Sequence, residues 1–281
     1  MVAMDDGPRL AVRRSGRTLD LPPVVLVHGG PGLWDYLAPV AALVDDLTAV
    51  YRYDQRGCGS SDPSLDQSFD RHVTDLDKLR SALGLQRWAV VGHSFGATLA
   101  LAYASTHPDH TSHLGYLSGV GVGDWHTPYE QERARRMTAK QRAELAELEN
   151  RERSDSEERR FRALAWVTDH GDRANAWRWA MEDAESLRPI NYAANRQLTA
   201  ETKSWTDADV VAKARAIRCP TLVLHGERDP RPASSALELA AEIKSSTSLV
   251  VQGAGHRPWR EDANAVRAAL RALLVGAPDE Q

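Results

Sequence analysis

The chain has 281 residues, 42% of them hydrophobic, and a formal net charge of −4. This length fits one large domain or a core with an inserted subdomain, and the charge balance lacks the basic excess that nucleic-acid binding requires. No apolar run approaches the ~20 residues that cross a bilayer, and residues 1–10 contain no apolar stretch of signal-peptide length.

The sequence contains two cysteines, Cys58 and Cys219. They share no C-x-x-C spacing and so predict no zinc site, and reduced thiols are typical of a cytoplasmic protein. We therefore expect a cytoplasmic protein with no metal, no cofactor and no nucleic-acid or membrane partner. Its oligomeric state has no signature in the sequence.

Short apolar runs alternate with helical patterns in both terminal parts of the chain. The runs are bounded by glycine, proline or aspartate, which is typical of buried strands. This alternation predicts an α/β fold, a mostly parallel, doubly wound sheet whose catalytic loops gather at the carboxyl ends of the strands. The predicted strands are 24–27, 49–53, 88–91, 114–120, 221–225 and 248–251, and the predicted helices are 37–47, 73–83, 97–105, 233–243 and 264–274.

The segment from about 121 to 208 does not follow this alternation of strands and helices. It is highly charged and contains no convincing strand, and it predicts helices over 129–153, 156–167 and 173–185. A helical insertion between two core strands is interpreted as a cap that lies over the mouth of the site.

The predicted units are therefore a first core part at 1–120, a helical cap at 121–210 and a second core part at 211–281. Five of the eight tryptophans lie in the cap. We expect most of them to pack within the cap and one or two to line a substrate pocket, with Trp177 and Trp179 as the candidates.

The most specific feature is the pentapeptide Gly-His-Ser-Phe-Gly at 92–96, which matches G-x-S-x-G. It stands between the predicted strand 88–91 and the predicted helix 97–105, the context in which this motif forms a nucleophile elbow. Glycines leave room for the sharp turn that projects the serine hydroxyl into a cleft. Ser94 is the predicted nucleophile.

A serine nucleophile needs a base, and in this arrangement the partners follow in the order serine, acid, histidine. Of the ten histidines only His256 follows the last acidic loop, directly after the predicted strand 248–251. We expect His256 to be the base. The acid should follow the preceding strand, where Gly-Glu-Arg-Asp-Pro occupies 226–230.

Asp229 is the favoured acid because the H-G-x-x-D turn carries its carboxylate to the loop tip that faces the histidine. Its role would be to fix the imidazole tautomer and stabilise the imidazolium. We expect Glu227 to pair locally with Arg228 or to reach solvent. Asp124, after the fourth predicted strand, is the alternative acid.

Acyl transfer also needs hydrogen-bond donors for the developing oxyanion. The amide of Phe95, directly after the nucleophile, is one candidate. The other is Gly30 in the loop His-Gly-Gly-Pro-Gly at 28–32, where the backbone can approach a substrate closely. A phosphate-binding interpretation is weak because the sequence has no G-x-x-x-x-G-K-[ST] motif.

Three motifs in order resemble the proline iminopeptidases: the glycine loop at 28–32, Asp-Gln-Arg-Gly-Cys-Gly-x-Ser at 54–61, and the elbow at 92–96 with its following helix. These are serine peptidases of the α/β-hydrolase fold with a helical cap. The likeness covers about 20–120 and 215–275. It implies a cap inserted between core strands of an α/β-hydrolase sheet.

By this resemblance, Ser94, Asp229 and His256 form the catalytic triad. Gly30 and Phe95 supply the oxyanion donors. Residues Asp54 and Arg56 of the second motif have a structural role below the site, bracing its loop.

Two departures from the family pattern concern specificity. The elbow of the family usually reads Gly-Gly-Ser-Trp-Gly, whereas this chain has His93 and Phe95 at the variable positions. The family also carries cap glutamates that bind the free amino group of the substrate. Glu182 and Glu185 could supply that charge, and the alternative is that both are solvent-facing helix carboxylates.

The leading hypothesis is a serine hydrolase that cleaves a small amide or ester through an acyl-enzyme, such as an aminopeptidase that releases proline from a short peptide. The alternative is an esterase or lactonase for an uncharged small metabolite, distinguished by the absence of pocket carboxylates. A ligand-sensing receptor on the same fold is less favoured because the triad is intact. Epoxide hydrolases and haloalkane dehalogenases would need an aspartate in place of Ser94.

Overall fold

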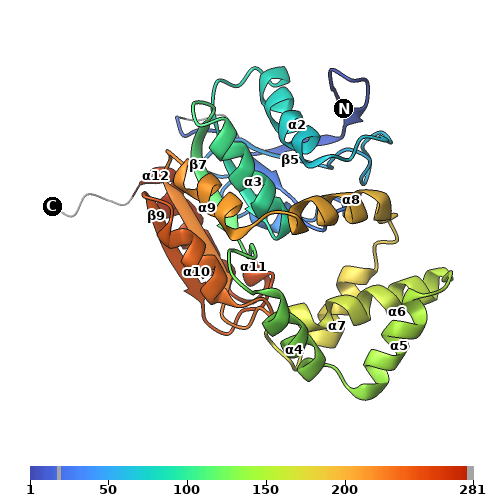
Figure 1. Ribbon diagram of the computed structural model, residues 1–281. Helices are drawn as coiled ribbons and strands as arrows, with labels where there is room; N and C mark the ends of the chain where they lie inside the picture. The colour runs from blue at the N-terminus through green and yellow to red at the C-terminus, as the bar shows by residue number, and fades with distance from the viewer. Residues whose placement is uncertain (18–19, 277–281) are drawn as a thin grey trace.

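A seven-stranded sheet forms the centre of the computed structural model, which describes residues 1–17 and 20–276 (Figure 1). The strand order is β3-β5-β4-β6-β7-β8-β9; β3 pairs antiparallel with β5, and the other neighbours are parallel. The predicted mostly parallel sheet is confirmed. The strands are β3 Val12–Ser15, β4 Val24–Val27, β5 Val50–Tyr53, β6 Trp88–His93, β7 Thr111–Leu117, β8 Thr221–Gly226 and β9 Ser246–Val251.

Each of the six predicted strands occurs, with ends shifted by a few residues. The fourth is displaced most, because β7 begins at Thr111 and ends at Leu117. Strand β3 was not predicted: it carries two arginines and lies at the edge of the sheet, where its pattern resembles a polar loop. A separate antiparallel pair joins β1 Val2–Ala3 and β2 Arg9–Leu10.

Helices cover both faces of the sheet. Strand β4 is therefore buried on both sides, which explains why its four residues are all apolar. Val25 and Val27 point into one core cluster, while Val24 and Leu26 point into the other. A parallel strand buried on both faces cannot alternate polar and apolar residues. The first cluster contains residues of α2 Phe69–Ala82, α3 Phe95–Thr106 and α10 Ala233–Ala241, and the second contains residues of α1 Ala38–Ala41 and α12 Ala263–Val275.

The predicted helix 37–47 is shorter in the structure, where only Ala38–Ala41 is α-helical. The predicted helix 129–153 is two helices, because Thr138 starts a second one. Its side chain accepts a hydrogen bond from the amide of Gln141, whose side chain accepts one from the Thr138 amide. This reciprocal pair of hydrogen bonds is a capping box, which marks the start of a helix. It divides a segment that is otherwise helix-prone throughout.

Helices α4 to α7 lie away from the sheet (Figure 1). Two small apolar clusters of their own hold them together. By contrast, α8 and α9 contribute Leu198 and Ala214 to the first core cluster. The boundaries at 121 and 210 stay predictions. These elements are α4 His126–Arg136, α5 Ala139–Glu149, α6 Asp155–Trp166, the 3₁₀ turn η1 Val167–Asp169, α7 Ala176–Ala184, α8 Tyr192–Lys203 and α9 Asp207–Arg215.

Among the described residues, no helix has the length and apolar character that crossing a membrane requires. The remaining helix of the core is α11 Pro258–Glu261, directly after the predicted base. Both cysteines are buried and unpaired.

A buried ion pair braces the loop after β5. Arg56 is fully buried, and its guanidinium donates to both carboxylate oxygens of Asp75 on α2, at 2.6 and 2.7 Å. It also contacts Asp6 at 2.9 Å, which ties the N-terminal segment to the core. Asp54, also fully buried, accepts hydrogen bonds from the backbone amides of Asp35 and Ser60. These contacts agree with the structural role expected for Asp54 and Arg56.

We predict that Asp75→Ala lowers the free energy of unfolding by about 3–5 kcal/mol, because it leaves the Arg56 charge buried without its main partner. Urea denaturation followed by circular dichroism measures the change. The matched control is Asp46→Ala, which removes a solvent-exposed partner of Arg271 and should leave the midpoint near that of the wild type. Equal midpoints for the two variants would contradict the prediction.

Candidate active site

Ser94 occupies a strained turn between β6 and α3. Its backbone angles are φ 57° and ψ −125°, a conformation that side-chain-bearing residues rarely adopt and that costs about 1–3 kcal/mol. The flanking glycines are required by space: a Cβ on Gly92 would come 2.0 Å from the carbonyl oxygen of Gly96, and one on Gly96 would come 2.1 Å from that of Val27. The sharp turn presents the serine side chain at the carboxyl end of the strand.

Three predicted residues meet at this edge of the sheet. Ser94 follows β6, Asp229 follows β8 and His256 follows β9. The Oγ of Ser94 lies 2.9 Å from Nε2 of His256, and Nδ1 of His256 lies 2.5 Å from Oδ2 of Asp229. Because the ionised carboxylate can only accept, Nδ1 carries the proton, and the lone pair of Nε2 faces the serine hydroxyl. This arrangement can remove a proton from Ser94.

The alternative acid Asp124 and the neighbouring Glu227 lie elsewhere. Asp124 is exposed and accepts a hydrogen bond from the amide of Thr127. Glu227 is exposed and accepts one from the amide of Gly253. The structure brings only Asp229 of these three carboxylates to His256.

Asp229 is buried between two histidines and Arg231. Burial alone would raise its pKa, but the electrostatic interactions with His256, His225 and Arg231 and the hydrogen bond from His256 outweigh this and hold the pKa well below its usual range. Arg231 contacts Oδ1 of Asp229 at 3.2 Å and Asp169 at 2.9 Å. The carboxylate therefore stays ionised beside the imidazole.

Residues from the cap side also hold the loop that carries His256. The amide of His256 donates to the carbonyl oxygen of Asp169 at 2.7 Å. The carboxylate of Glu261 accepts from the amides of Gly171, Asp172 and Gly255 at 2.6, 2.9 and 2.5 Å. Sequence patterns do not signal the contacts of Arg231 with Asp169 or of Glu261 with Gly171 and Asp172, because these contacts join residues far apart in the chain.

The two predicted oxyanion donors have unengaged amides. Neither Gly30 nor Phe95 donates a hydrogen bond through its backbone amide among the described residues. The neighbouring Gly29 amide is already taken, since it donates to the hydroxyl of Tyr36 at 2.9 Å. Helix α8 supports the glycine loop, because the Asn195 side chain donates to the carbonyl oxygen of Pro31 at 2.8 Å.

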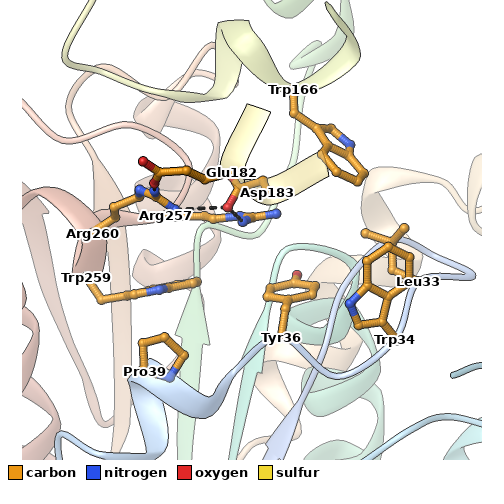
Figure 2. Close-up of a pocket in the computed structure, with 10 residues that line it drawn as sticks. All are labelled: Leu33, Trp34, Tyr36, Pro39, Trp166, Glu182, Asp183, Arg257, Trp259 and Arg260. Carbon is orange, nitrogen blue, oxygen red and sulfur yellow. Dashed lines mark hydrogen bonds and ion pairs between the residues drawn. The ribbon is translucent and has the colours of Figure 1, made fainter. Parts of the chain in front are cut away.

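A cavity of about 330 Å³ lies between the loop after β4, the cap and the segment after His256 (Figure 2). Tyr36 and Trp259 lie on one side, and charged side chains of the cap and of α11 lie opposite. A Cβ on Gly29 would contact both the Tyr36 hydroxyl, at 2.7 Å, and the Cβ of Ser94, at 2.8 Å. Gly29 therefore separates Tyr36, which lines the cavity, from Ser94, which does not. The lining residues are Leu33, Trp34, Tyr36, Pro39, Trp166, Glu182, Asp183, Arg257, Trp259 and Arg260.

Of the four predicted substrate-binding residues, Glu182 lines this cavity and the other three do not. Trp177 packs inside the cap clusters, with Arg160 over its ring. Trp179 packs against His170. Glu185 is exposed. The aromatic lining comes instead from Trp34, Trp166, Tyr36 and Trp259, which only the packing of cap on core reveals.

The carboxylates of the cavity are paired with arginines. Glu182 contacts Arg178 at 2.8 Å and also pairs with Arg260. Asp183 lies 2.8 Å from Arg257 and 2.9 Å from Arg260. The cavity thus holds as many arginines as acids among its lining residues, and its charges compensate one another.

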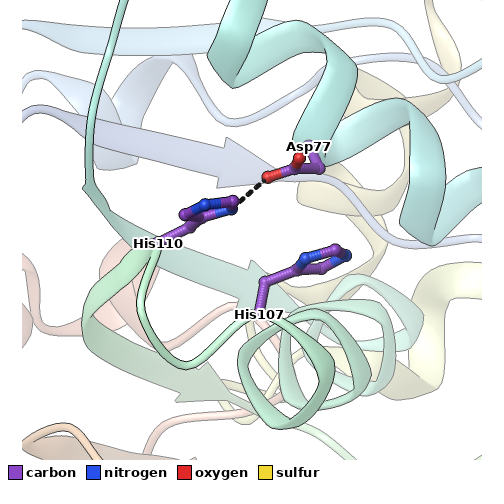
Figure 3. Close-up of side chains that lie close together, drawn as sticks. All are labelled: Asp77, His107 and His110. Atoms are coloured by element: carbon purple, nitrogen blue, oxygen red, sulfur yellow. Dashed lines mark hydrogen bonds and ion pairs between the residues drawn. The ribbon is translucent and has the colours of Figure 1, made fainter.

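A cluster of Asp77, His107 and His110 has the donor types of a metal site (Figure 3). His107 caps the end of α3 opposite to Ser94. However, Oδ1 of Asp77 already accepts from Arg80 at 2.9 Å and lies 2.7 Å from Nδ1 of His110. The two imidazole rings are stacked, 6° from parallel. Since a ring nitrogen directs its lone pair within the ring plane, two stacked rings do not converge on one ion. The geometry does not fit a metal centre.

Comparison with known proteins adds three findings. A family model described as alpha/beta hydrolase fold matches residues 22–258. The chain is 41% identical to a proline iminopeptidase of Xylella fastidiosa over 123 residues, which are 43% of this chain and 39% of the relative. The chain thus spans about two fifths of the length of that relative.

Among solved structures, an esterase from Thermogutta terrifontis matches with a TM-score of 0.73 at 22% identity, covering 97% of this chain and 95% of that one. A proline iminopeptidase of Mycobacterium smegmatis matches with a TM-score of 0.70 at 22% identity, covering 95% of both chains. At this identity the likeness concerns the fold alone, and it is nearly equal for two different activities.

We predict that Glu261→Ala lowers the free energy of unfolding by about 1.5–3 kcal/mol, because three backbone amides lose a charged acceptor. Thermal and urea denaturation measure the loss. Glu227→Ala is the matched control, since that carboxylate accepts from a single backbone amide, of Gly253. A loss at Glu261 no larger than that at Glu227 would contradict the prediction, because three contacts would then contribute no more than one.

Proposed function

The chain belongs to the alpha/beta hydrolase fold family, and on that basis we propose that it is a serine hydrolase that works through an acyl-enzyme. The observation that carries the proposal is the continuous hydrogen-bonded series from Ser94 through His256 to Asp229. A ligand-sensing protein on the same fold has no need of an aligned nucleophile, base and acid, so the receptor alternative has weaker support.

In the proposed acylation step, Oγ of Ser94 attacks the carbonyl carbon of the substrate while Nε2 of His256 takes the hydroxyl proton. The negative charge that develops on the carbonyl oxygen is stabilised by the amides of Gly30 and Phe95, each such donor being worth about 3–4 kcal/mol of barrier. Asp229 holds the imidazole and stabilises its charged form.

The tetrahedral intermediate then collapses. The bond to the leaving group breaks, and His256 returns the proton to the departing oxygen or nitrogen. Water attacks the acyl-enzyme by the same route, with His256 as base, and releases the acid and free Ser94.

For the substrate, we favour an ester with an uncharged, partly aromatic organic group. The cavity beside Ser94 offers aromatic walls, and its two carboxylates are engaged by arginines. A substrate ammonium buried there would lack an anionic partner of its own, which is costly. Glu182 therefore fits an ion pair that fastens the cap better than an amine-binding role.

The second candidate is an aminopeptidase that releases proline. It is favoured by the 41% identity to a proline iminopeptidase over 123 residues. Under this candidate an acidic side chain of the cap would have to exchange its arginine partner for the substrate ammonium.

We predict that a fluorophosphonate probe labels the wild-type protein and that Ser94→Ala abolishes the labelling, because the probe reacts only with an activated hydroxyl. Gel fluorescence and intact mass spectrometry measure the adduct. Ser60→Ala, at an exposed serine outside the site, should label like the wild type. Labelling that persists in Ser94→Ala would contradict the assignment of the nucleophile.

We predict that the enzyme hydrolyses 4-nitrophenyl butyrate and does not prefer proline 4-nitroanilide over N-acetylproline 4-nitroanilide. The two anilides share a leaving group, and acetylation replaces the ammonium by a neutral amide, so their ratio of kcat/KM reports whether the site requires a free amino group. A preference for free proline of tenfold or more, lost in Glu182→Gln but kept in Glu185→Gln, a control outside the cavity, would support the aminopeptidase instead.

A further inference from the structure

His93, the residue before Ser94, connects the loops of the site through both of its ring nitrogens. It is 2% exposed. Its Nδ1 lies 2.7 Å from the hydroxyl oxygen of Tyr36, and its Nε2 lies 2.7 Å from the backbone carbonyl oxygen of His256. A single buried side chain thus contacts the loop after β4 and the loop after β9.

The direction of these hydrogen bonds is fixed by chemistry. A carbonyl oxygen can only accept, so Nε2 of His93 carries the proton and donates to His256. Nδ1 then has a free lone pair and accepts from the hydroxyl of Tyr36. That hydroxyl in turn accepts from the amide of Gly29, at 2.9 Å. Every donor and acceptor in the series Gly29, Tyr36, His93, His256 has a partner.

The surroundings hold the imidazole of His93 in one position. Its ring meets Trp259 edge-on at 4.6 Å and lies 4.8 Å from the ring of His256. Burial, together with the neighbouring His256, keeps the pKa of His93 well below its ordinary value, so the side chain is neutral. A neutral ring with one donor and one acceptor is what this series requires.

The contact with His256 completes the fixation of that residue. The amide of His256 donates to Asp169 at 2.7 Å, and its carbonyl oxygen accepts from His93 at 2.7 Å. Its Nδ1 contacts Asp229 at 2.5 Å. With both backbone groups and one ring nitrogen held, the remaining ring nitrogen is left for Ser94.

We propose that His93 is a positioning residue, which holds the imidazole of His256 and the Gly29–Gly30 loop in register with Ser94. This inference rests on the proposed role of Ser94 and His256 in acyl transfer. It assigns a role to His93, which is one of the two positions at which the elbow departs from the proline iminopeptidase pattern Gly-Gly-Ser-Trp-Gly.

Four variants test the proposal, with kcat and KM for 4-nitrophenyl butyrate corrected for the fraction of sites that a fluorophosphonate titrates. His93→Phe keeps an aromatic ring and removes both nitrogens. His93→Gln retains a donor within reach of the His256 carbonyl, whereas His93→Asn retains only an acceptor for Tyr36. Tyr36→Phe removes the hydroxyl alone.

We expect His93→Phe to lower kcat by about 10²-fold with KM changed by about threefold at most, since small misplacement of a catalytic group costs this much. His93→Gln should recover more of kcat than His93→Asn, because the contact with His256 matters most for the chemical step. Tyr36→Phe should lower kcat by about tenfold, the size of one lost hydrogen bond. In the double variant His93→Phe with Tyr36→Phe, the fold-loss of kcat should be smaller than the product of the fold-losses in the two single variants.

The matched control is Tyr103→Phe. The hydroxyl of Tyr103 is also buried and makes two contacts, accepting from Trp88 at 3.2 Å and donating to Asp77 at 3.1 Å, but it lies outside the site. This variant should lower the melting temperature and leave kcat and KM unchanged. If the role of His93 were merely structural, its variants would behave in the same way as Tyr103→Phe. An unchanged kcat in His93→Phe would therefore overturn the proposal. A kcat that is higher in His93→Asn than in His93→Gln would overturn it as well.

A readout without substrate separates this proposal from the proposed function. The proton on Nδ1 of His256, in its short contact with Asp229, should give a far-downfield proton resonance in the wild type and in Tyr103→Phe. His93→Phe should shift or broaden it. If the wild type resists the fluorophosphonate and His93→Phe still perturbs this resonance, the proposed function fails and the positioning role stands. If His93→Phe leaves the resonance unperturbed, the positioning role is overturned.

Discussion

Backbone segments approach one another closely at the end of β6, and the geometry of the site depends on this constraint. Gly92 and Gly96 leave no room for a methyl group, and between them Ser94 is held at a positive φ. The strain is sustained because a fully buried strand lies on one side and a largely buried helix on the other. The serine hydroxyl therefore stands at the edge of the sheet, in the one place where loops from several parallel strands converge.

Around this fixed serine, the other loops are held by contacts between distant parts of the chain. His256 is fastened to Asp169 of the cap and to His93 of the elbow. Asp229 is fastened to Arg231, which also pairs with Asp169. Because each loop is bound to at least one other, the relative positions of Ser94, His256 and Asp229 are set by the fold. For the proposed acyl transfer, such preorganisation lowers the barrier.

Sequence patterns predicted the sheet and the residues Ser94, Asp229 and His256 that meet at its edge, because both depend on local signals: apolar runs, glycine turns and the order of the loops. They did not predict Glu261 or Asp169, whose partners follow from how the cap docks on the core. They also favoured Trp177 and Trp179 as pocket residues, whereas Trp34, Trp166 and Trp259 line the cavity. Which face of a cap helix meets the core is a tertiary property that composition does not encode.

Under the proposed function, the charges between cap and core bear on which substrates the site accepts. Glu182 and Asp183 on α7 pair with Arg260 and Arg257, which lie just after His256, and Asp169 pairs with Arg231 beside Asp229. The acidic residues of the cap therefore fasten it to the loops that carry His256 and Asp229. To bind an ammonium with the same carboxylates, the protein would have to release these contacts and loosen the support of the catalytic loops. A neutral substrate avoids that conflict, because it can enter the aromatic cavity while every ion pair stays in place.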